Sequence, residues 1–283
     1  MGSPVLLTLG HGYSAAALAA SLQPGWRCIG TVRSGQKSVA LASKGVEPVL
    51  WDDRAAVDEA IRIATHIVMS IPPDADGDPA ILRHGETLRD AKQIEWVAYL
   101  STTGVYGDRR GGWVDETTEP APGNERSVRR VEAERAWIST GLPVQIFRLS
   151  GIYGPGRSAF ERLRAGRATR IVKPGQVFSR IHRDDIARAL RASIGRPNPG
   201  AIYNLADDLP APPQDVVAYA AERLGLPIPP DIPLEEANLS PMGLSFYAES
   251  RRVSNTQTKK DLGIDLLYPD YRAGLDAILA QET

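Results

Sequence analysis

The sequence is poor in cysteine, in lysine and in long apolar segments. Its single cysteine, Cys28, excludes a disulfide within the chain, so a reducing cytoplasm is the expected compartment. No segment approaches the roughly 20 apolar residues of a transmembrane helix, and the apolar run at 5–9 is too short for a signal peptide. The formal net charge of -1 gives no general preference for nucleic acid or an anionic membrane. We therefore expect a globular protein that binds a small molecule, not a nucleic acid or a membrane.

Two glycines stand between the first apolar run and an alanine-rich segment, a pattern typical of a strand, a tight turn and a helix. The turn reads Gly10, His11, Gly12, Tyr13, Ser14 and Ala15, with the spacing G-x-G-x-x-A. Gly10 permits a strained turn, Gly12 leaves room for a pyrophosphate, and Ala15 lets the helix pack closely on the strand. The first N–H groups of the helix, around Tyr13 and Ser14, would face the phosphates. An ordinary glycine turn is the alternative to this dinucleotide-binding interpretation.

The end of the second predicted strand, at 26–33, should lie beside the adenosine ribose of a dinucleotide. A site that prefers NAD usually carries Asp or Glu there, whereas this chain has Arg33, followed by Ser34 and Lys37. A guanidinium matches a 2′-phosphate well, and the other two side chains could add donors. A solvated charge at a strand end is the alternative. We predict NADP(H) as the cofactor, with NAD as the second choice.

The next strand ends add further candidate cofactor contacts. Asp52 and Asp53 close the third predicted strand, where a carboxylate could accept from the adenine amino group or cap the following helix. Ser70, Ile71 and Pro72 end the fourth strand above the sheet, beside the expected cofactor.

Strands and helices alternate with short connections, which predicts an α/β fold with a doubly wound parallel sheet. The strands are predicted at 5–9, 26–33, 48–51, 66–71 and 94–100, and the helices between them at 15–22, 38–44, 55–64 and 78–92.

Four later motifs resemble those of extended short-chain dehydrogenases/reductases, the nucleoside-diphosphate-sugar epimerase and dehydratase group. They are Leu100 to Gly107 (S-[ST]-x-x-V-Y-G), Phe147 to Gly156 (R-x-x-x-x-Y-G-P-G), Arg180 to Ala187 (I-H-V-D-D-[IL]-A) and Ile202 to Asp208 (Y-N-[IV]-x-[DS]). The resemblance implies a Rossmann NADP-binding domain over 1–150 and 181–206. It also implies a small, mostly helical substrate-binding region over 151–180 and 207–283.

The resemblance also implies roles for single residues. Thr102 matches the residue at the end of the fifth strand that hydrogen-bonds the reacting hydroxyl or carbonyl. His182, Asp184 and Asp185 match positions that fix the packing of the two regions. A single histidine without a second ligand-type neighbour does not indicate a metal site, and we predict none.

One feature of the family is missing. Its members carry Tyr-x-x-x-Lys on the helix after the fifth strand, but no lysine of this chain has a tyrosine four residues before it. If Glu134 is the glutamate that often follows the lysine, Arg130 stands at the lysine position and Arg126 at the tyrosine position. Arg130 could still donate to the cofactor ribose. Arg126 cannot act as an acid or base near neutral pH but could stabilise an oxyanion or hold an anionic group. A solvated helix face is the alternative for both.

The proton would then need another carrier. Tyr106 and Tyr153 are the phenols in motif positions near the expected cleft, and we rank Tyr106 first, although both could merely line it. Arg157 begins an arginine-rich segment after the G-P-G turn, which favours an anionic substrate; a solvated basic helix is the alternative. The proline-rich segment 227–240 is predicted to be a loop over the cleft.

The motifs together predict an NAD(P)-binding oxidoreductase or epimerase-like protein. Its substrate would be small, anionic or sugar-type, and would react at a carbon that bears an oxygen. The missing dyad favours the alternative of a non-catalytic NADP(H)-binding sensor. The chain is expected to be a monomer or a homodimer.

Overall fold

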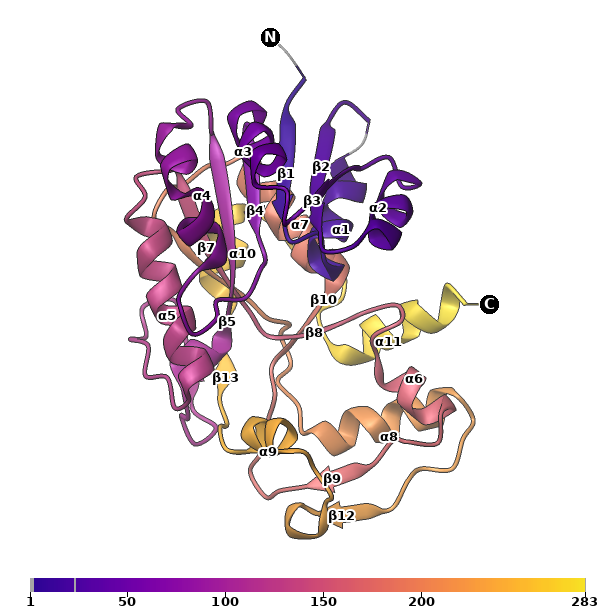
Figure 1. The fold of residues 1–283 in the computed structure, drawn as a ribbon. Coiled ribbons are helices and arrows are strands. Elements are labelled where there is room, and N and C mark those ends of the chain that lie inside the picture. The colour runs from indigo at the N-terminus through magenta and orange to yellow at the C-terminus, as the bar shows by residue number, and fades with distance from the viewer. Residues whose placement is uncertain (1–2, 23, 283) are drawn as a thin grey trace.

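The computed structural model describes residues 3–22 and 24–282, and its centre is a parallel sheet flanked by helices (Figure 1). Over these residues the sheet has seven strands in the order β11-β7-β5-β4-β1-β2-β3. The strands are β1 (Val5–Leu9), β2 (Arg27–Val32), β3 (Glu47–Leu50), β4 (His66–Met69), β5 (Trp96–Thr102), β7 (Val144–Leu149) and β11 (Ile202–Leu205). All their pairings are parallel. From β1 the chain adds β2 and β3 on one side, and then β4, β5, β7 and β11 on the other, so the strand order reverses between β1 and β4. The predicted doubly wound Rossmann fold is confirmed.

Helices cover both faces of the sheet because the strand side chains alternate between two cores. On one face, Leu6 and Phe147 pack under α1 (Tyr13–Leu22) and α7 (Arg183–Ile194). On the other, Leu7 and Tyr99 pack under three helices. These helices are α3 (Arg54–Ile63), α4 (Pro79–Asp90) and α5 (Glu125–Ile138), while α2 (Gly35–Ala42) lies beside β3. The strand β4 is buried along its whole length, as its unbroken apolar run predicts.

A smaller part of the chain packs around a third core beyond the carboxyl ends of the strands (Figure 1). Its helices are α6 (Ala159–Arg164), α8 (Pro213–Arg223) and α11 (Tyr271–Ala280), with Tyr153 and Phe160 among the buried residues. Three short parallel pairs accompany it: β8 (Gly151–Tyr153) with β10 (Arg180–His182), β9 (Arg170–Val172) with β12 (Asp231–Pro233), and β6 (Trp113–Val114) with β13 (Arg252–Val253). The remaining elements are the 3-10 helices η1 (Thr103–Tyr106) and η2 (Leu234–Glu236), and the helices α9 (Pro241–Tyr247) and α10 (Thr256–Leu262).

The third family motif joins these two parts of the chain. The Asp185 carboxylate accepts from the backbone N–H groups of Leu267 (2.6 Å) and Tyr268 (3.1 Å). The His182 ring contacts the ring of Tyr268 at 4.1 Å between centroids, and its Nδ1 accepts from the Asp184 N–H. These contacts support the packing role that the resemblance implies for the motif.

The structure differs from the sequence expectations mainly near the C-terminus. The predicted loop at 227–240 contains β12 and η2, and the seven-residue helix α9 that follows was not predicted. Its start signals are present, because Ser240 accepts from the N–H of Gly243 and Pro241 opens the helix. The boundaries of the two predicted regions stay a prediction. No helix among the described residues is long and apolar enough to cross a membrane.

Candidate functional site

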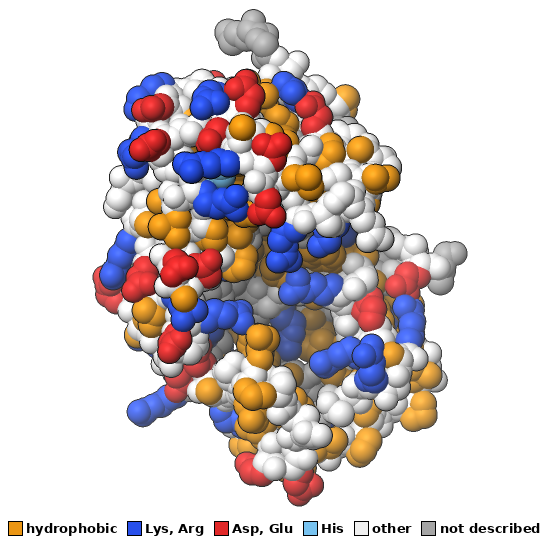
Figure 2. Space-filling model, in the orientation of Figure 1, with side chains coloured by type: hydrophobic (Ala, Val, Ile, Leu, Met, Phe, Trp, Pro, Cys, Tyr) orange, Lys and Arg blue, Asp and Glu red, His pale blue; other side chains and the backbone are white. Residues whose placement is uncertain are grey.

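A cleft of about 1130 Å³ lies between the carboxyl ends of the strands and the smaller part of the chain. Figure 2 shows arginine and lysine side chains gathered around a hollow at the centre of this face. Ligands of open parallel sheets bind at this edge, next to the point where the strand order reverses. Nine of the predicted site residues line the cleft: Gly12, Tyr13, Ser14, Ser70, Thr102, Arg126, Arg130, Tyr153 and Arg157.

The two glycines of the first turn have different environments. Gly10 has a φ of 85°, and a Cβ added there would lie 2.8 Å from Cγ1 of Ile71. Ser70 holds the turn from the same side, because its Oγ donates to the Gly10 carbonyl at 2.6 Å. Gly12 is exposed in the cleft, and a Cβ added there would have no neighbour closer than 4.0 Å. Gly10 therefore serves the backbone, while Gly12 keeps a space in the cleft open.

Helix α1 begins beside this space. Ala15 is fully buried against the sheet, while Ser14 and Tyr13 line the cleft. The Tyr13 hydroxyl donates to the Pro155 carbonyl at 2.9 Å. The guanidinium carbons of Arg183 and Arg157 lie 5.0 and 5.8 Å from the centre of its ring. Tyr13 thus connects the glycine turn to the G-P-G turn after β8.

The residues predicted for the adenosine end lie on an open surface. Arg33, Ser34 and Lys37 are exposed after β2, and Ser34 makes no side-chain cap to α2. Asp53 caps α3 by accepting from the Ala56 N–H at 3.0 Å, the helix-cap alternative weighed from the sequence. Asp52 pairs with Arg83 at 3.4 Å. Pro72 is also exposed.

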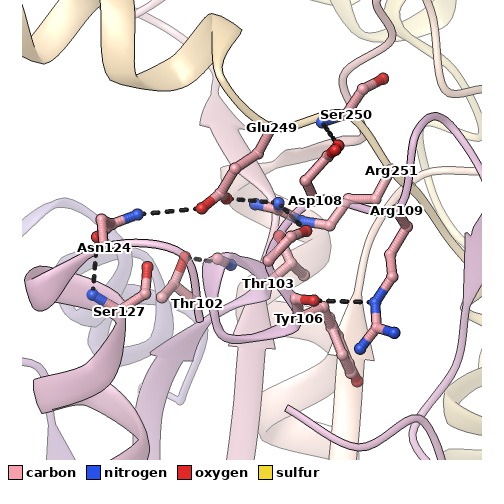
Figure 3. A network of polar contacts seen from close by, with 12 residues as sticks. Thr102, Thr103, Tyr106, Asp108, Arg109, Asn124, Ser127, Glu249, Ser250 and Arg251 are labelled. Atoms are coloured by element: carbon pink, nitrogen blue, oxygen red, sulfur yellow. Dashed lines mark hydrogen bonds and ion pairs between the residues drawn. The ribbon is translucent and has the colours of Figure 1, made fainter. Parts of the chain in front are cut away.

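The end of β5 and the start of α5 bring two hydroxyls and one cation to the cleft. Thr102 accepts from the Gly104 N–H at 3.1 Å, and buried Ser127 lies next to it (Figure 3). Both hydroxyls face Gly104, where an added Cβ would lie 3.3 Å from Thr102 Oγ1 and 3.1 Å from Ser127 Oγ. Arg130 donates from Nη1 to the Leu100 carbonyl at 3.0 Å. Arg126, one turn earlier, is exposed and stacks 5.9 Å above the Phe246 ring.

A buried ion pair fixes α5 on the sheet one turn after Arg130. Arg148 and Glu134 are bonded through both arms, at 2.8 and 3.2 Å, and their side chains are only 3% and 7% exposed. Ser101 Oγ donates to the same carboxylate at 2.5 Å. This arrangement connects residues from three motifs and sets the rotation of α5 that directs Arg130 towards the end of β5.

The two candidate phenols are not equivalent. Tyr106 is fully buried, and its hydroxyl donates to Asn204 Oδ1 at 2.8 Å, while the Arg148 guanidinium lies 4.9 Å above its ring. Burial raises the pKa of Tyr106. This placement, outside the cleft lining, argues against the proton-carrier role ranked first from the sequence. Tyr153 does line the cleft, but its hydroxyl donates to the Asp270 carbonyl at 3.3 Å and burial raises its pKa strongly.

The arginine-rich segment after the G-P-G turn faces the cleft only in part. Arg157 and Arg162 line the cleft, whereas Arg164 pairs with Glu282 and Arg170 pairs with Asp231. Other residues that line the cleft had no site role assigned from the sequence. These include Ser127, Arg180, Phe246, Tyr247, Glu249 and Arg251.

Glu249 fastens the segment after α9 to the rim of the cleft (Figure 3). Its carboxylate accepts from Asn124 Nδ2 at 3.1 Å and from Arg251 Nη1 at 2.7 Å. The same Arg251 nitrogen donates to the Gly107 carbonyl at 2.7 Å. Asn124 and Glu249 are 125 residues apart in the sequence, so no local pattern could have predicted their contact.

The comparisons with known proteins agree with this geometry. No family model matches the chain. Protein YeeZ of Escherichia coli (strain K12) is 30% identical over 279 residues, which cover 93% of this chain and 95% of YeeZ. A conserved protein of unknown function from Silicibacter pomeroyi DSS is 50% identical, with a TM-score of 0.94 over 98% of this chain and 99% of that one. A structure from Methylobacillus flagellatus, described as an NAD-dependent epimerase/dehydratase, is 25% identical, with a TM-score of 0.75 over 100% of this chain and 99% of that one.

The chain belongs to the short-chain dehydrogenase/reductase superfamily. Within it, the similarity is to the NAD-dependent epimerase/dehydratase-like proteins. A 3-diazoavenalumate denitrifying reductase of Streptomyces sp is 30% identical over 168 residues, 55% of this chain and 54% of that one. MoeE5, solved with UDP-glucuronic acid and NAD, shares the fold at 19% identity, with a TM-score of 0.74 over 99% and 100% of the chains.

Proposed function

We propose that this superfamily member is an NAD(P)-binding oxidoreductase or epimerase-like enzyme that acts on a small anionic substrate. The observation that carries the proposal is that Gly12, Thr102 and Arg130 open on one cleft. Gly12 provides open space beside the start of a helix, as a pyrophosphate requires. Thr102 and Arg130 provide donors where the sheet edge meets that space.

The residues around the first turn fit a dinucleotide. Gly12, Tyr13 and Ser14 would hold the pyrophosphate, on the turn that Gly10 permits, and Arg130 would face the nicotinamide ribose. A bound nicotinamide dinucleotide would supply or accept the hydride. Arg33, Ser34 and Lys37 are exposed donors after β2, which supports NADP(H) over NAD. NAD itself accompanies MoeE5.

On the substrate side, hydroxyls and cations take the place of the usual phenol. The Thr102 hydroxyl accepts from a backbone N–H and can donate to a substrate oxygen, with the Ser127 hydroxyl beside it. Arg126, Arg157 and Arg162 line the same cleft and favour an anion. No tyrosine of the sequence precedes a lysine by four residues, so the substrate oxygen does not meet the usual proton carrier.

The same absence supports a second candidate, a non-catalytic NADP(H)-binding sensor. Burial of the Tyr106 hydroxyl behind Asn204 favours this alternative, because it removes one replacement acid from the cleft.

Cofactor titration followed by turnover separates the two. We expect NADPH to change the protein fluorescence at a lower concentration than NADH does. Arg33→Ala should weaken NADPH binding about tenfold and leave NADH binding unchanged. The exposed Arg54→Ala serves as the matched control. Equal affinity for the two cofactors, unchanged in Arg33→Ala, would refute the 2′-phosphate assignment.

Turnover is then measured with NADPH and a panel of ketones, aldehydes and organic acids. Hydride transfer from NADPH to any compound of this panel would support the proposal that the protein is an enzyme. Tight NADPH binding without oxidation across the panel, together with a protein partner retained only by one redox form, would establish the sensor instead.

A further inference from the structure

The half of the cleft furthest from the glycine turn has mostly apolar walls. They come from the segment around β9 and β10, from α8 and from α9 with its flanks. The apolar side chains that line the cleft there are Ile171, Val177, Phe178, Val217, Leu239, Met242, Phe246 and Tyr247. Such walls favour a hydrocarbon or aromatic body and offer few partners to sugar hydroxyls.

The guanidinium of Arg180 stands among these walls. Arg180, on β10, lines the cleft and donates from Nη1 to the carbonyls of Phe178 (2.9 Å) and Ala211 (3.0 Å). Both bonds use the same nitrogen, so the edge formed by Nε and Nη2 remains for a ligand. Arg162, on α6, also lines the cleft, and Arg126 lies over the Phe246 ring. A planar carboxylate matches one guanidinium edge through two parallel hydrogen bonds.

Asp207 lies behind Arg180 without balancing its charge at neutral pH. It is 1% exposed, and its backbone N–H donates to the Arg180 carbonyl at 2.6 Å. Neither carboxyl oxygen has a hydrogen-bond partner among the residues that the structure describes. Burial raises the pKa of Asp207 to about 8, against the lowering effect of Arg180. A mostly neutral acid beside a buried cation leaves a charge for a ligand to balance.

The other charged and titratable groups around this pair do not supply that balance. Asp208 is bonded to Asn255 and Lys259. The Asp270 carboxylate caps α11. Both carboxylates raise the pKa of Asp207 further. The tyrosines whose phenols act on the charge of Arg180 are Tyr153, Tyr247 and Tyr271, and burial raises their pKa values.

We propose that the far half of the cleft binds the carboxylate of a small organic acid with an apolar body, and that the free edge of Arg180 recognises it. This inference rests on the proposed function, because the acid would be the substrate that meets the cofactor. It separates this chain from a binder of nucleoside diphosphate sugars, since the apolar walls around the Arg180 edge offer few partners to sugar hydroxyls.

The test is calorimetric titration of the protein, with and without saturating NADPH, using hexanoate, benzoate and 3-phenylpropionate. Each acid is compared with its neutral amide, and UDP-glucose is titrated in parallel. We expect at least one acid to bind at least tenfold more tightly than its amide and more tightly than UDP-glucose. Binding of the acid without NADPH, in a protein that does not bind NADPH, would preserve this inference while the proposed function fails.

Two variants make the result specific. Arg180→Lys keeps the charge but removes the planar edge. We expect it to weaken binding of the acid at least fivefold and to leave the NADPH affinity unchanged. Arg164→Ala, whose guanidinium pairs with Glu282 instead, should match the parent chain. Unchanged acid affinity in Arg180→Lys, equal binding of acids and amides, or tighter binding of UDP-glucose would overturn the inference.

The pH dependence provides an independent readout. As the pH rises through about 8, Asp207 ionises, and its negative charge then competes with the ligand carboxylate for the charge of Arg180. Acid affinity should therefore fall between pH 7 and 9, and Asp207→Asn should bind the acid equally well across that range. An affinity that falls in the same way in Asp207→Asn would contradict the assigned roles.

Discussion

The two ends of the cleft are built by different means. At the near end, neighbouring strands of the sheet end at or just before Gly12, Ser70 and Thr102 and place them on the cleft. At the far end, long side chains such as Arg180, Phe246 and Tyr247 arrive from separate segments of the smaller part. The near end is thus determined by the topology of the sheet, which many ligands can share. The far end is determined by side-chain chemistry, and there we expect the substrate to be selected.

The largest effect should come from breaking the frame of the near end. Glu134→Ala leaves the Arg148 charge buried without its partner, which typically costs about 3–5 kcal/mol of unfolding free energy. Urea unfolding followed by circular dichroism measures the loss. Exposed Glu132→Ala, on the same helix, is the control and should change little. Equal losses in the two variants would show that the ion pair does not hold α5 on the sheet.

A second substitution separates ligand binding from folding at the near end. Gly12→Ala adds a methyl group where nothing lies closer than 4.0 Å, so thermal stability should be kept. The methyl group would occupy the space expected for the pyrophosphate, and NADPH affinity should fall about tenfold or more, or about 1.4 kcal/mol. Gly195→Ala, at the end of α7 with a φ of -73°, is the control for both measurements. Unchanged NADPH affinity in a stable Gly12→Ala protein would place the dinucleotide elsewhere.

The same contrast explains how much the sequence could predict. The near end follows from local patterns, because an apolar strand, a glycine turn and a helix start follow one another directly from Val5 to Ala15. Thr102 and Arg130 could be placed from motif spacing, and both line the cleft. Motif spacing does not predict the position of Tyr106 correctly, because the 3-10 helix η1 follows β5 directly and turns the Tyr106 ring into the core.

The far end depends on contacts that no local pattern encodes. Arg180 lies in a recognised motif, but only the fold shows that its guanidinium faces apolar walls. Glu249 meets Asn124 across 125 residues, and α9 is too short and glycine-containing for a clear helical period. For Asp53 the sequence allows two roles, a ligand contact or a helix cap. The structure shows that Asp53 caps α3.

The smallest effect tests whether the position of an arginine on α6 decides its effect on the ligand. Arg162 and Arg164 lie two residues apart on α6, but Arg162 lines the cleft and Arg164 pairs with Glu282. Arg162→Ala should weaken binding of the organic acid about two- to threefold. The effect should be smaller at high salt, because the Arg162 charge acts on the ligand through solvent. Arg164→Ala should leave the affinity unchanged at 50 and at 300 mM salt. If both variants weakened the acid alike, the attraction would come from the overall field of the basic helix, and the distinction drawn here between lining and paired arginines would be lost.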